Sequence, residues 1–218
     1  MATAADAPVD DLVHVAGAES RLLDAVRGLG DTDMAAPSRL PGWTVAHLLT
    51  HLARNADSHR RRTVAAVAGV MVDQYPGGMA ERAAEIEAGA GRSAAEVVAD
   101  VATASTAMLE AWMAVPDGAW SGVTRDAGGT ERPLAELPGR RWLEVEVHLV
   151  DLGTGPDHRA WPEAFVATRL AELRPGVAAR LPAGATLPAP GALDERDELA
   201  WLYGRLARPD LPVLGPWQ

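Results

Sequence analysis

The residues best suited to chemistry are a glutamate and a histidine four positions apart, Glu144 and His148. On an α-helix, side chains at this spacing leave the same face, with their Cβ atoms about 5–6 Å apart. Both can therefore reach a single metal ion, whereas Glu146 would leave the helix in another direction. The pair predicts part of a metal site, and an ordinary surface pair is the alternative interpretation.

A metal site needs at least one more ligand, and one other stretch offers histidines at helical spacing. Residues 40–53 contain a Pro-Gly turn, a helix start at Thr44, and then His47 and His51. One of these histidines, together with the glutamate and histidine of the first stretch, would give a His/His/Glu set with an open coordination position. That pattern is typical of a catalytic rather than a structural zinc.

The first stretch is expected to lie on a helix. Leu143, Val147 and Val150 recur at helical spacing, and Gly153 stands where a helix C-terminus favours a residue that tolerates positive φ. The apolar alternation over residues 143–149 also permits a strand. The flanking Arg, Glu and Leu residues and the stop at Gly153 favour the helix.

Periodicity and helix-end signals predict four long helices, with the candidate ligands on the second and the fourth. The expected ranges are residues 10–29, 44–68, 93–115 and 134–152, with a short helix over 79–87. The capping box that begins at Ser93 is the clearest helix start. Four such helices suggest a bundle whose core holds the metal.

Two further expectations concern which side chains are buried. The second helix should bury Val45, Leu48, Leu49, Leu52 and Val64 and turn Arg60, Arg61 and Arg62 to solvent. His14, His59 and His158 lie outside the two stretches and are expected to face solvent. Trp43 is expected to pack its loop onto the bundle.

Composition excludes several kinds of chemistry. The 218 residues include no cysteine, which rules out disulfides, thiolate ligands, iron–sulfur clusters and a cysteine nucleophile. The net charge of −10 argues against nonspecific nucleic-acid binding, although all 20 basic residues are arginine. Neither a signal-peptide pattern nor an apolar run of about 18 residues is found, so we expect a cytoplasmic protein without a membrane span.

Three stretches together resemble the mycothiol-dependent maleylpyruvate isomerase family. They are residues 41–51, residues 144–152, and residues 201–205 with the Pro- and Trp-containing segment 212–217. The resemblance implies a mainly α fold: a DinB-like metal-binding four-helix bundle over residues 1–155, and a small, shortened C-terminal α/β domain over residues 156–218. The strands that the family has in this second domain are reduced here to something like residues 185–187.

The resemblance also implies the roles of particular residues. The zinc ligands would be His51, Glu144 and His148. His47 would lie one turn earlier and hydrogen-bond nearby, or else replace His51 as the ligand. From its place at the end of the helix, Asp151 is expected to bond locally or to orient a ligand, and a role as a metal ligand is the alternative.

A catalytic role is implied for Arg205, which stands where the family has an arginine at the end of its last helix. Its guanidinium could bind a substrate carboxylate bidentately. The alternative is a surface ion pair with Asp197 or Glu198.

The implied reaction uses a thiol, because zinc favours the reactive thiolate. Since the chain has no cysteine, the thiol must be a small molecule such as mycothiol. Its thiolate would add to the cis double bond of maleylpyruvate, and rotation and elimination would give the trans product. The alternatives are a mycothiol S-transferase acting on an electrophile and a non-catalytic metal-dependent binding protein. Expected partners are the thiol and an anionic or electrophilic small molecule, with no nucleic acid and no membrane, in a monomer or homodimer.

Overall fold

The computed structural model describes residues 6–215, which form two compact units that divide between Thr154 and Gly155. The first unit contains α1 (Val9–Val26), α2 (Asp31–Ala35), α3 (Val45–Val67), α4 (Gly78–Ala90), α5 (Ala94–Met113), β1 (Val123–Arg125), β2 (Glu131–Pro133) and α6 (Leu137–Asp151). The second unit contains α7 (Glu163–Leu173) and α8 (Glu195–Leu202). Short 3₁₀ segments cover Ala119–Ser121, Leu134–Glu136, His158–Ala160 and Arg174–Arg180. The prediction of a mainly α fold is confirmed.

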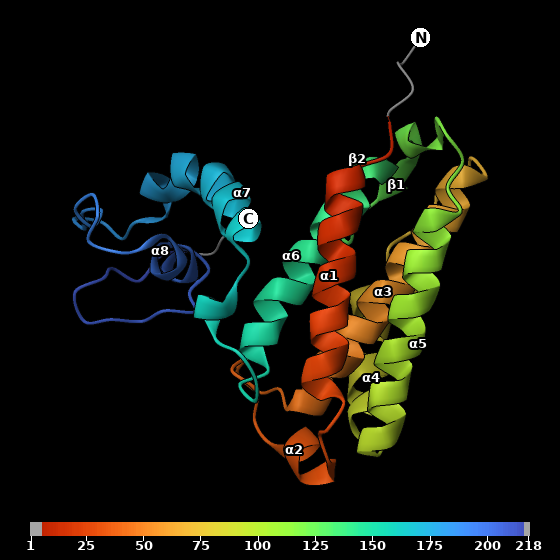
Figure 1. Cartoon of the computed structure of the whole chain (residues 1–218), viewed down its shortest axis with the longest axis horizontal. Helices are drawn as coiled ribbons and strands as arrows, with labels where there is room; N and C mark the ends of the chain where they lie inside the picture. Colours follow the sequence, from red (N-terminus) through yellow and green to blue (C-terminus); the bar gives the residue numbers. More distant parts are fainter. Residues whose placement is uncertain (1–5, 216–218) are drawn as a thin grey trace. The chain divides into compact units, whose positions relative to one another are not determined.

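The long helices α1, α3, α5 and α6 form the expected bundle (Figure 1). α3 packs mainly against α5 and α1 mainly against α6, and smaller contacts of α1 with α5 and of α3 with α6 close the bundle. Its core consists of almost fully buried apolar side chains, among them Val15, Leu22, Leu48, Leu52, Val101, Met108, Trp112, Trp142 and Val145. Burying a side chain of this size contributes about 1.5–3 kcal/mol, so these helices hold their relative positions firmly.

The predicted ends of the two helices that carry the candidate ligands are confirmed. Thr44 is the N-cap of α3, and its hydroxyl oxygen accepts a hydrogen bond from the backbone N–H of His47. α6 ends at Asp151, and Gly153 follows with a φ of +72°, a value that glycine adopts without strain. Both helices are therefore fixed at the end nearest the candidate ligands.

The short helix α4 packs against α3 through a glycine. A Cβ atom on Gly89 would lie 2.3 Å from Cγ2 of Thr50, so only glycine allows this close an approach. Because Thr50 directly precedes His51 in α3, this packing brings α4 beside the candidate ligands. β1 and β2 form an antiparallel hairpin in which Val123 pairs with Pro133. The chain continues from this hairpin through a short 3₁₀ segment into α6.

The predicted burial of the second half of α3 is wrong. Val64 is 58% exposed, whereas His59 and Arg62 are buried. The inward positions continue from Leu52 at helical spacing, but their occupants include Asn55, His59 and Arg62. Because these polar side chains occupy the inward face, hydrophobicity alone predicted the wrong face for this half of the helix.

The other two histidines that were expected to face solvent also pack against the protein. The ring of His14 is stacked on that of Trp142, with the ring centroids 4.2 Å apart. His158 is only 8% exposed, and its Nε2 lies 2.8 Å from Oδ1 of Asp197. His158 is therefore part of the interior of the second unit.

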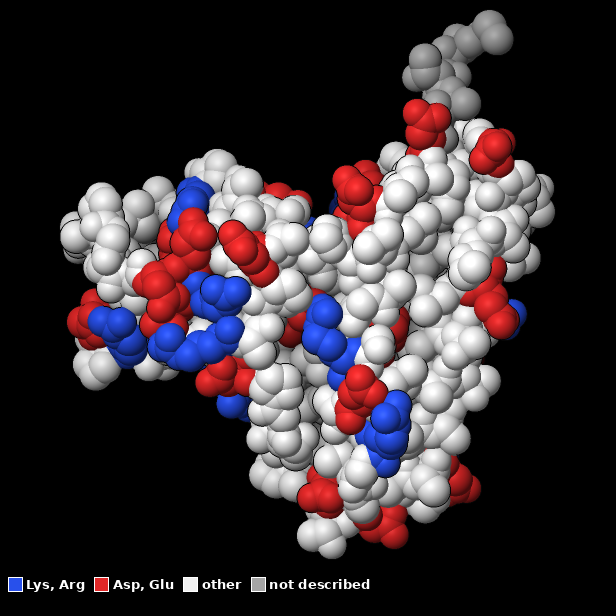
Figure 2. All heavy atoms as spheres, in the orientation of Figure 1, with Lys and Arg blue, Asp and Glu red and all other residues white. Residues whose placement is uncertain are grey.

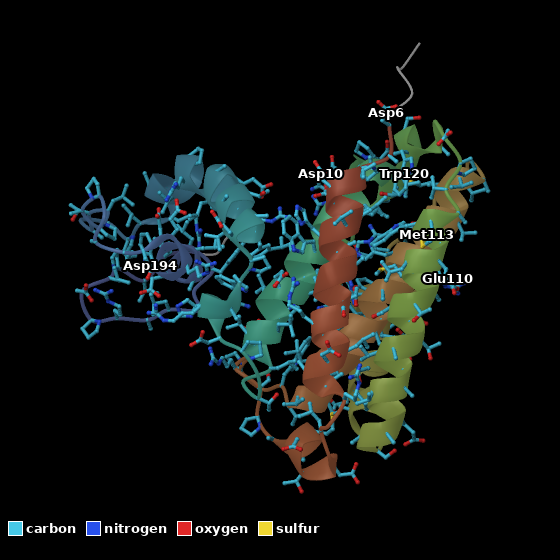
Figure 3. The ribbon with its side chains drawn as sticks, viewed as in Figure 1. Asp6, Asp10, Glu110, Met113, Trp120 and Asp194 are labelled. Carbon is cyan, nitrogen blue, oxygen red and sulfur yellow. The ribbon has the colours of Figure 1, made fainter. Side chains whose placement is uncertain are left out.

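The second unit is built around α7 and α8, which pack against each other. Trp161, Phe165 and Leu199 are buried between the elements of this unit. Asp194, marked in Figure 3, is the N-cap of α8 and accepts a hydrogen bond of 2.9 Å from the backbone N–H of Asp197. Within the described part of the unit no strand forms, including at residues 185–187, where a strand-like piece was expected.

The surface carries charges of both signs. Figure 2 shows acidic and basic side chains next to each other over the visible face, in agreement with ion pairs such as that of Arg174 with Glu198. Among residues 6–215, no helix combines the length and the apolar character needed to cross a membrane.

Candidate metal centre

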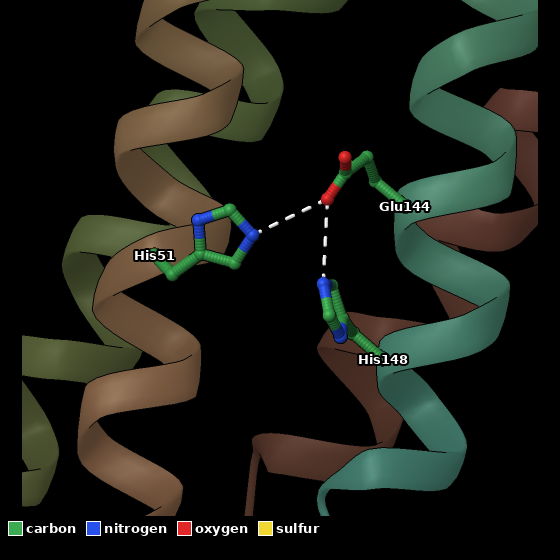
Figure 4. Close-up of side chains that lie close together, drawn as sticks. All are labelled: His51, Glu144 and His148. Carbon is green, nitrogen blue, oxygen red and sulfur yellow. Dashed lines mark hydrogen bonds and ion pairs between the residues drawn. The ribbon is translucent and has the colours of Figure 1, made fainter. Parts of the chain in front are cut away.

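His51, Glu144 and His148 lie together between two helices of the bundle (Figure 4). His51 belongs to α3, and the other two residues belong to successive turns of α6. Oε2 of Glu144 lies 3.2 Å from Nε2 of His51 and 3.3 Å from Nε2 of His148. The helical spacing places Glu144 and His148 on one face, and the packing of α3 near α6 brings His51 to them.

The geometry of this cluster fits a divalent metal ion. One ligand atom from each side chain lies within 4.8 Å of the other two. Metal–ligand bonds of about 2.1 Å in a tetrahedral site separate two ligand atoms by about 3.4 Å, close to both distances measured at Glu144. Two imidazole nitrogens and one carboxylate oxygen also form a donor set typical of catalytic zinc. The Glu144 side chain keeps 35% of its surface exposed, so solvent reaches the cluster.

The protein environment shifts the pKa of each of the three groups. Burial acts to raise the pKa of Glu144, but hydrogen bonds and positive charge from His148 and His51 outweigh it and hold that pKa well below its usual range. Burial lowers the pKa of His51. Burial also acts to lower the pKa of His148, but the carboxylates of Asp151 and Glu144 outweigh it and raise that pKa.

Asp151 lies behind His148. Its Oδ2 is 2.9 Å from Nδ1 of His148, and the residue is 1% exposed. A carboxylate in this position accepts the Nδ1 hydrogen and leaves the Nε2 lone pair for a metal. This contact agrees with the expectation that Asp151 bonds locally or orients a ligand.

His51 has a different neighbour behind its ring. Nη2 of Arg82, from α4, donates a hydrogen bond of 2.9 Å to Nδ1 of His51. The ring of Trp43 lies beside it, with the ring centroids 5.6 Å apart. Groups of opposite charge thus lie behind the two histidine rings, a guanidinium behind His51 and a carboxylate behind His148.

His47 lies outside the cluster and takes part in local hydrogen bonds. Its Nδ1 is 2.7 Å from Oγ1 of Thr44, which caps α3, and its Nε2 is 3.2 Å from Oε2 of Glu87. The structure therefore groups His51, not His47, with the glutamate and histidine of α6.

A buried ion pair holds α6 in register with its neighbours. Nε of Arg141 donates a 2.6 Å hydrogen bond to Oε1 of Glu19, on α1. Nη1 of Arg141 donates to the carbonyl oxygen of Leu52 at 2.8 Å and to Oδ1 of Asn55 at 2.9 Å, both on α3. The hydroxyl of Ser105, on α5, donates to Glu19 at 2.7 Å. Arg141 thus ties α6 to α3 close to the candidate site. It stands one turn before Glu144 in α6, and its acceptor Leu52 directly follows His51 in α3.

Arg205 belongs to the second unit and follows α8. It is partly buried, and its Nη1 donates a hydrogen bond of 2.6 Å to the carbonyl oxygen of Tyr203. Of the two acidic residues considered as its partners, Asp197 pairs with His158 and Arg159, and Glu198 pairs with Arg174. The catalytic role of Arg205 stays a prediction.

Two arginines near the cluster were not predicted from the sequence. Arg141 could have been found, because it stands three residues before Glu144 and so shares the helix face of Glu144 and His148. Arg82 gave no comparable signal. It reaches His51 only because α4 packs on α3, which the sequence pattern of α4 does not specify.

A helical bundle with a His/His/Glu cluster on two of its helices is a class of domain that could hold a metal ion. The family model for the mycothiol maleylpyruvate isomerase N-terminal domain matches residues 15–153, more than half of the chain. The chain belongs to this family.

Two crystal structures show the same fold: one of a mycothiol-dependent maleylpyruvate isomerase and one of its histidine-to-alanine mutant. The TM-scores are 0.84 and 0.83, at 21% sequence identity in each case. Each structural match covers 96% of this chain and 97% of the isomerase chain. No curated protein matches the sequence.

Proposed function

We propose that the chain is a metal-dependent enzyme that uses the small-molecule thiol mycothiol to isomerise a cis double bond, in maleylpyruvate or a related unsaturated keto acid. The observation that carries this proposal is the His51–Glu144–His148 cluster in a chain without any cysteine. Membership in the isomerase family and the fold of the solved isomerase support the same reaction.

The three clustered residues would hold a zinc ion, which when bound would favour the thiolate form of a thiol at the open position. Asp151 would keep the Nδ1 hydrogen of His148 in place and so present Nε2 to the metal. Arg141 would keep α6 in register with α3, so that His51 and Glu144 stay at ligand spacing.

The proposed reaction leaves the thiol unchanged. Sulfur adds to one carbon of the cis double bond, and the electron pair of the π bond moves into the adjacent carbonyl system. Rotation about the resulting single bond and expulsion of the same thiolate then restore the double bond in the trans form. An S-transferase would differ only at the last step, because the carbon–sulfur bond would remain.

Arg205 is proposed to bind one carboxylate of the substrate. The support is the resemblance of the segment that ends at Arg205 to the corresponding segment of the family. A guanidinium can grip a carboxylate with two parallel hydrogen bonds and stabilise negative charge that develops on the substrate.

The test is to incubate the zinc-loaded protein with mycothiol and maleylpyruvate and to follow the vinyl protons by NMR. We expect cis-to-trans conversion that requires both metal and thiol. His148→Ala should abolish it, and His47→Ala, a histidine outside the cluster, is the matched control. Conversion without thiol, or none with both present, would contradict the proposal. Accumulation of a stable mycothiol adduct would identify an S-transferase instead.

A further inference from the structure

Arg82 lies beside the candidate metal centre and has no role in the proposed reaction. It projects from α4, and Nη2 donates to Nδ1 of His51 at 2.9 Å. Its guanidinium carbon lies 5.9 Å from the ring centroid of Trp43 and 5.4 Å from that of Tyr75. Two aromatic rings and one imidazole therefore hold the guanidinium in place.

The charge of Arg82 is not neutralised by the protein. Within residues 6–215, no carboxylate lies within ion-pair distance of this guanidinium, although other arginines of the first unit do have such a partner. Arg54 and Arg92, for example, both pair with Asp100. A partly buried arginine without an acidic partner has free N–H donors suited to an anion, and its planar fork matches a carboxylate.

The hydrogen bond between Arg82 and His51 is incompatible with metal binding at Nε2 of His51. Arginine can only donate, so Nδ1 of His51 must accept and carries no hydrogen. A neutral imidazole that binds a metal through Nε2 carries its hydrogen on Nδ1. Two donors would then face each other, and Arg82 would have to release His51. His148 has no such conflict, because Asp151 accepts the hydrogen on its Nδ1.

We propose that Arg82 is an anion-binding residue of the candidate metal centre. A metal held at Nε2 of His51 would leave the guanidinium free to bind a carboxylate of the ligand. Only one imidazole ring separates the guanidinium from the metal position, so a small dicarboxylate can bind next to both. This inference rests on the proposed function, since it assigns a residue to the anionic substrate of the same site.

The test is calorimetric binding of maleate, an unreactive dicarboxylate, in the absence of thiol. The zinc-loaded protein should bind maleate, and the zinc-free protein at least tenfold more weakly. Arg82→Gln should weaken binding to the zinc-loaded protein at least tenfold, and Arg82→Lys should restore little of it. Arg60→Gln, at an exposed arginine of α3, changes the net charge equally and should leave binding unchanged.

A second measurement separates this role from a structural one. Because Arg82 competes for Nδ1 of His51, Arg82→Gln should bind zinc as tightly as the wild type or more tightly in a chelator competition. Weaker zinc binding by this variant, or maleate binding equal to that of the wild type, overturns the proposal, as does equal maleate binding with and without zinc. Because no thiol and no turnover are involved, a failed isomerase assay does not affect these outcomes.

Discussion

Replacing Arg141 by methionine should destabilise the bundle more than any change at an exposed arginine. Arg141 and Glu19 are 0% and 1% exposed, and their carboxylate–guanidinium contact links α6 to α1. Without Arg141, the buried Glu19 carboxylate would keep the Ser105 hydroxyl but lose the only cationic partner that it has among residues 6–215. The carbonyl of Leu52 and the amide oxygen of Asn55 would lose a donor as well.

The expected cost follows from this burial. Removing one partner of a buried ion pair costs about 3–5 kcal/mol, because the remaining charge stays away from water. At about 2–4 °C per kcal/mol for a chain of this size, Tm should fall by roughly 6–20 °C. Replacing both partners, as in Glu19→Leu with Arg141→Met, should recover most of the loss, since no unpaired charge is left.

The assay is urea unfolding followed by circular dichroism, with zinc affinity measured in parallel. Arg140→Met is the matched control, because Arg140 is 41% exposed and its pair with Glu136 contributes about 1 kcal/mol or less. The single variant at Arg141 should also bind zinc more weakly, because α6 loses its tie to α3. A cost below about 1 kcal/mol for Arg141→Met, or a double variant as unstable as the single one, would mean that this ion pair does not hold the bundle together.

Three further predictions follow from the same structure. Removing zinc by chelation should leave most of the helical circular dichroism signal, because the buried core suffices for folding; complete loss would make the metal structural. Arg205→Ala should lower kcat/KM by about 100-fold at unchanged zinc content, and Arg205→Lys should restore little; near-normal kinetics would return Arg205 to a surface role. Burial lowers the pKa of His59 well below the value of about 6.5 that a histidine has in an unfolded chain. Below about pH 6.5 the unfolded chain therefore binds a proton that the folded protein does not, and the free energy of unfolding should fall by up to about 1.4 kcal/mol per pH unit. His59→Gln should remove that part of the slope between pH 6.5 and 5 in urea unfolding, and an unchanged slope would contradict it.

The sequence predicted the parts of the fold that depend on local signals. The bundle helices were expected within a few residues of where they lie, because capping residues such as Thr44 and Ser93 and the glycine at 153 act within one helix turn. The pair of Glu144 and His148 was predictable for the same reason, since helix geometry alone places them on one face.

What the sequence did not predict depends on contacts between helices. His59 and Arg62 were expected at the surface because polar residues usually face solvent, but in α3 they occupy the inward face. Three consecutive arginines, such as residues 60–62, span about 200° of a helix, so one of them is readily turned inward. The position of Arg82 depends on the close packing of Gly89 on Thr50, which no local pattern reveals.

The proposed function depends on His51, Glu144 and His148 binding one metal ion together. The most direct test of this binding is the zinc content of dialysed protein by mass spectrometry, in the wild type and in the single variants His51→Ala and His47→Ala. We expect about one zinc per chain in the wild type and in His47→Ala, and far less in His51→Ala, because a catalytic-type site needs all three protein ligands. Full zinc in His51→Ala together with loss of zinc in His47→Ala would contradict it.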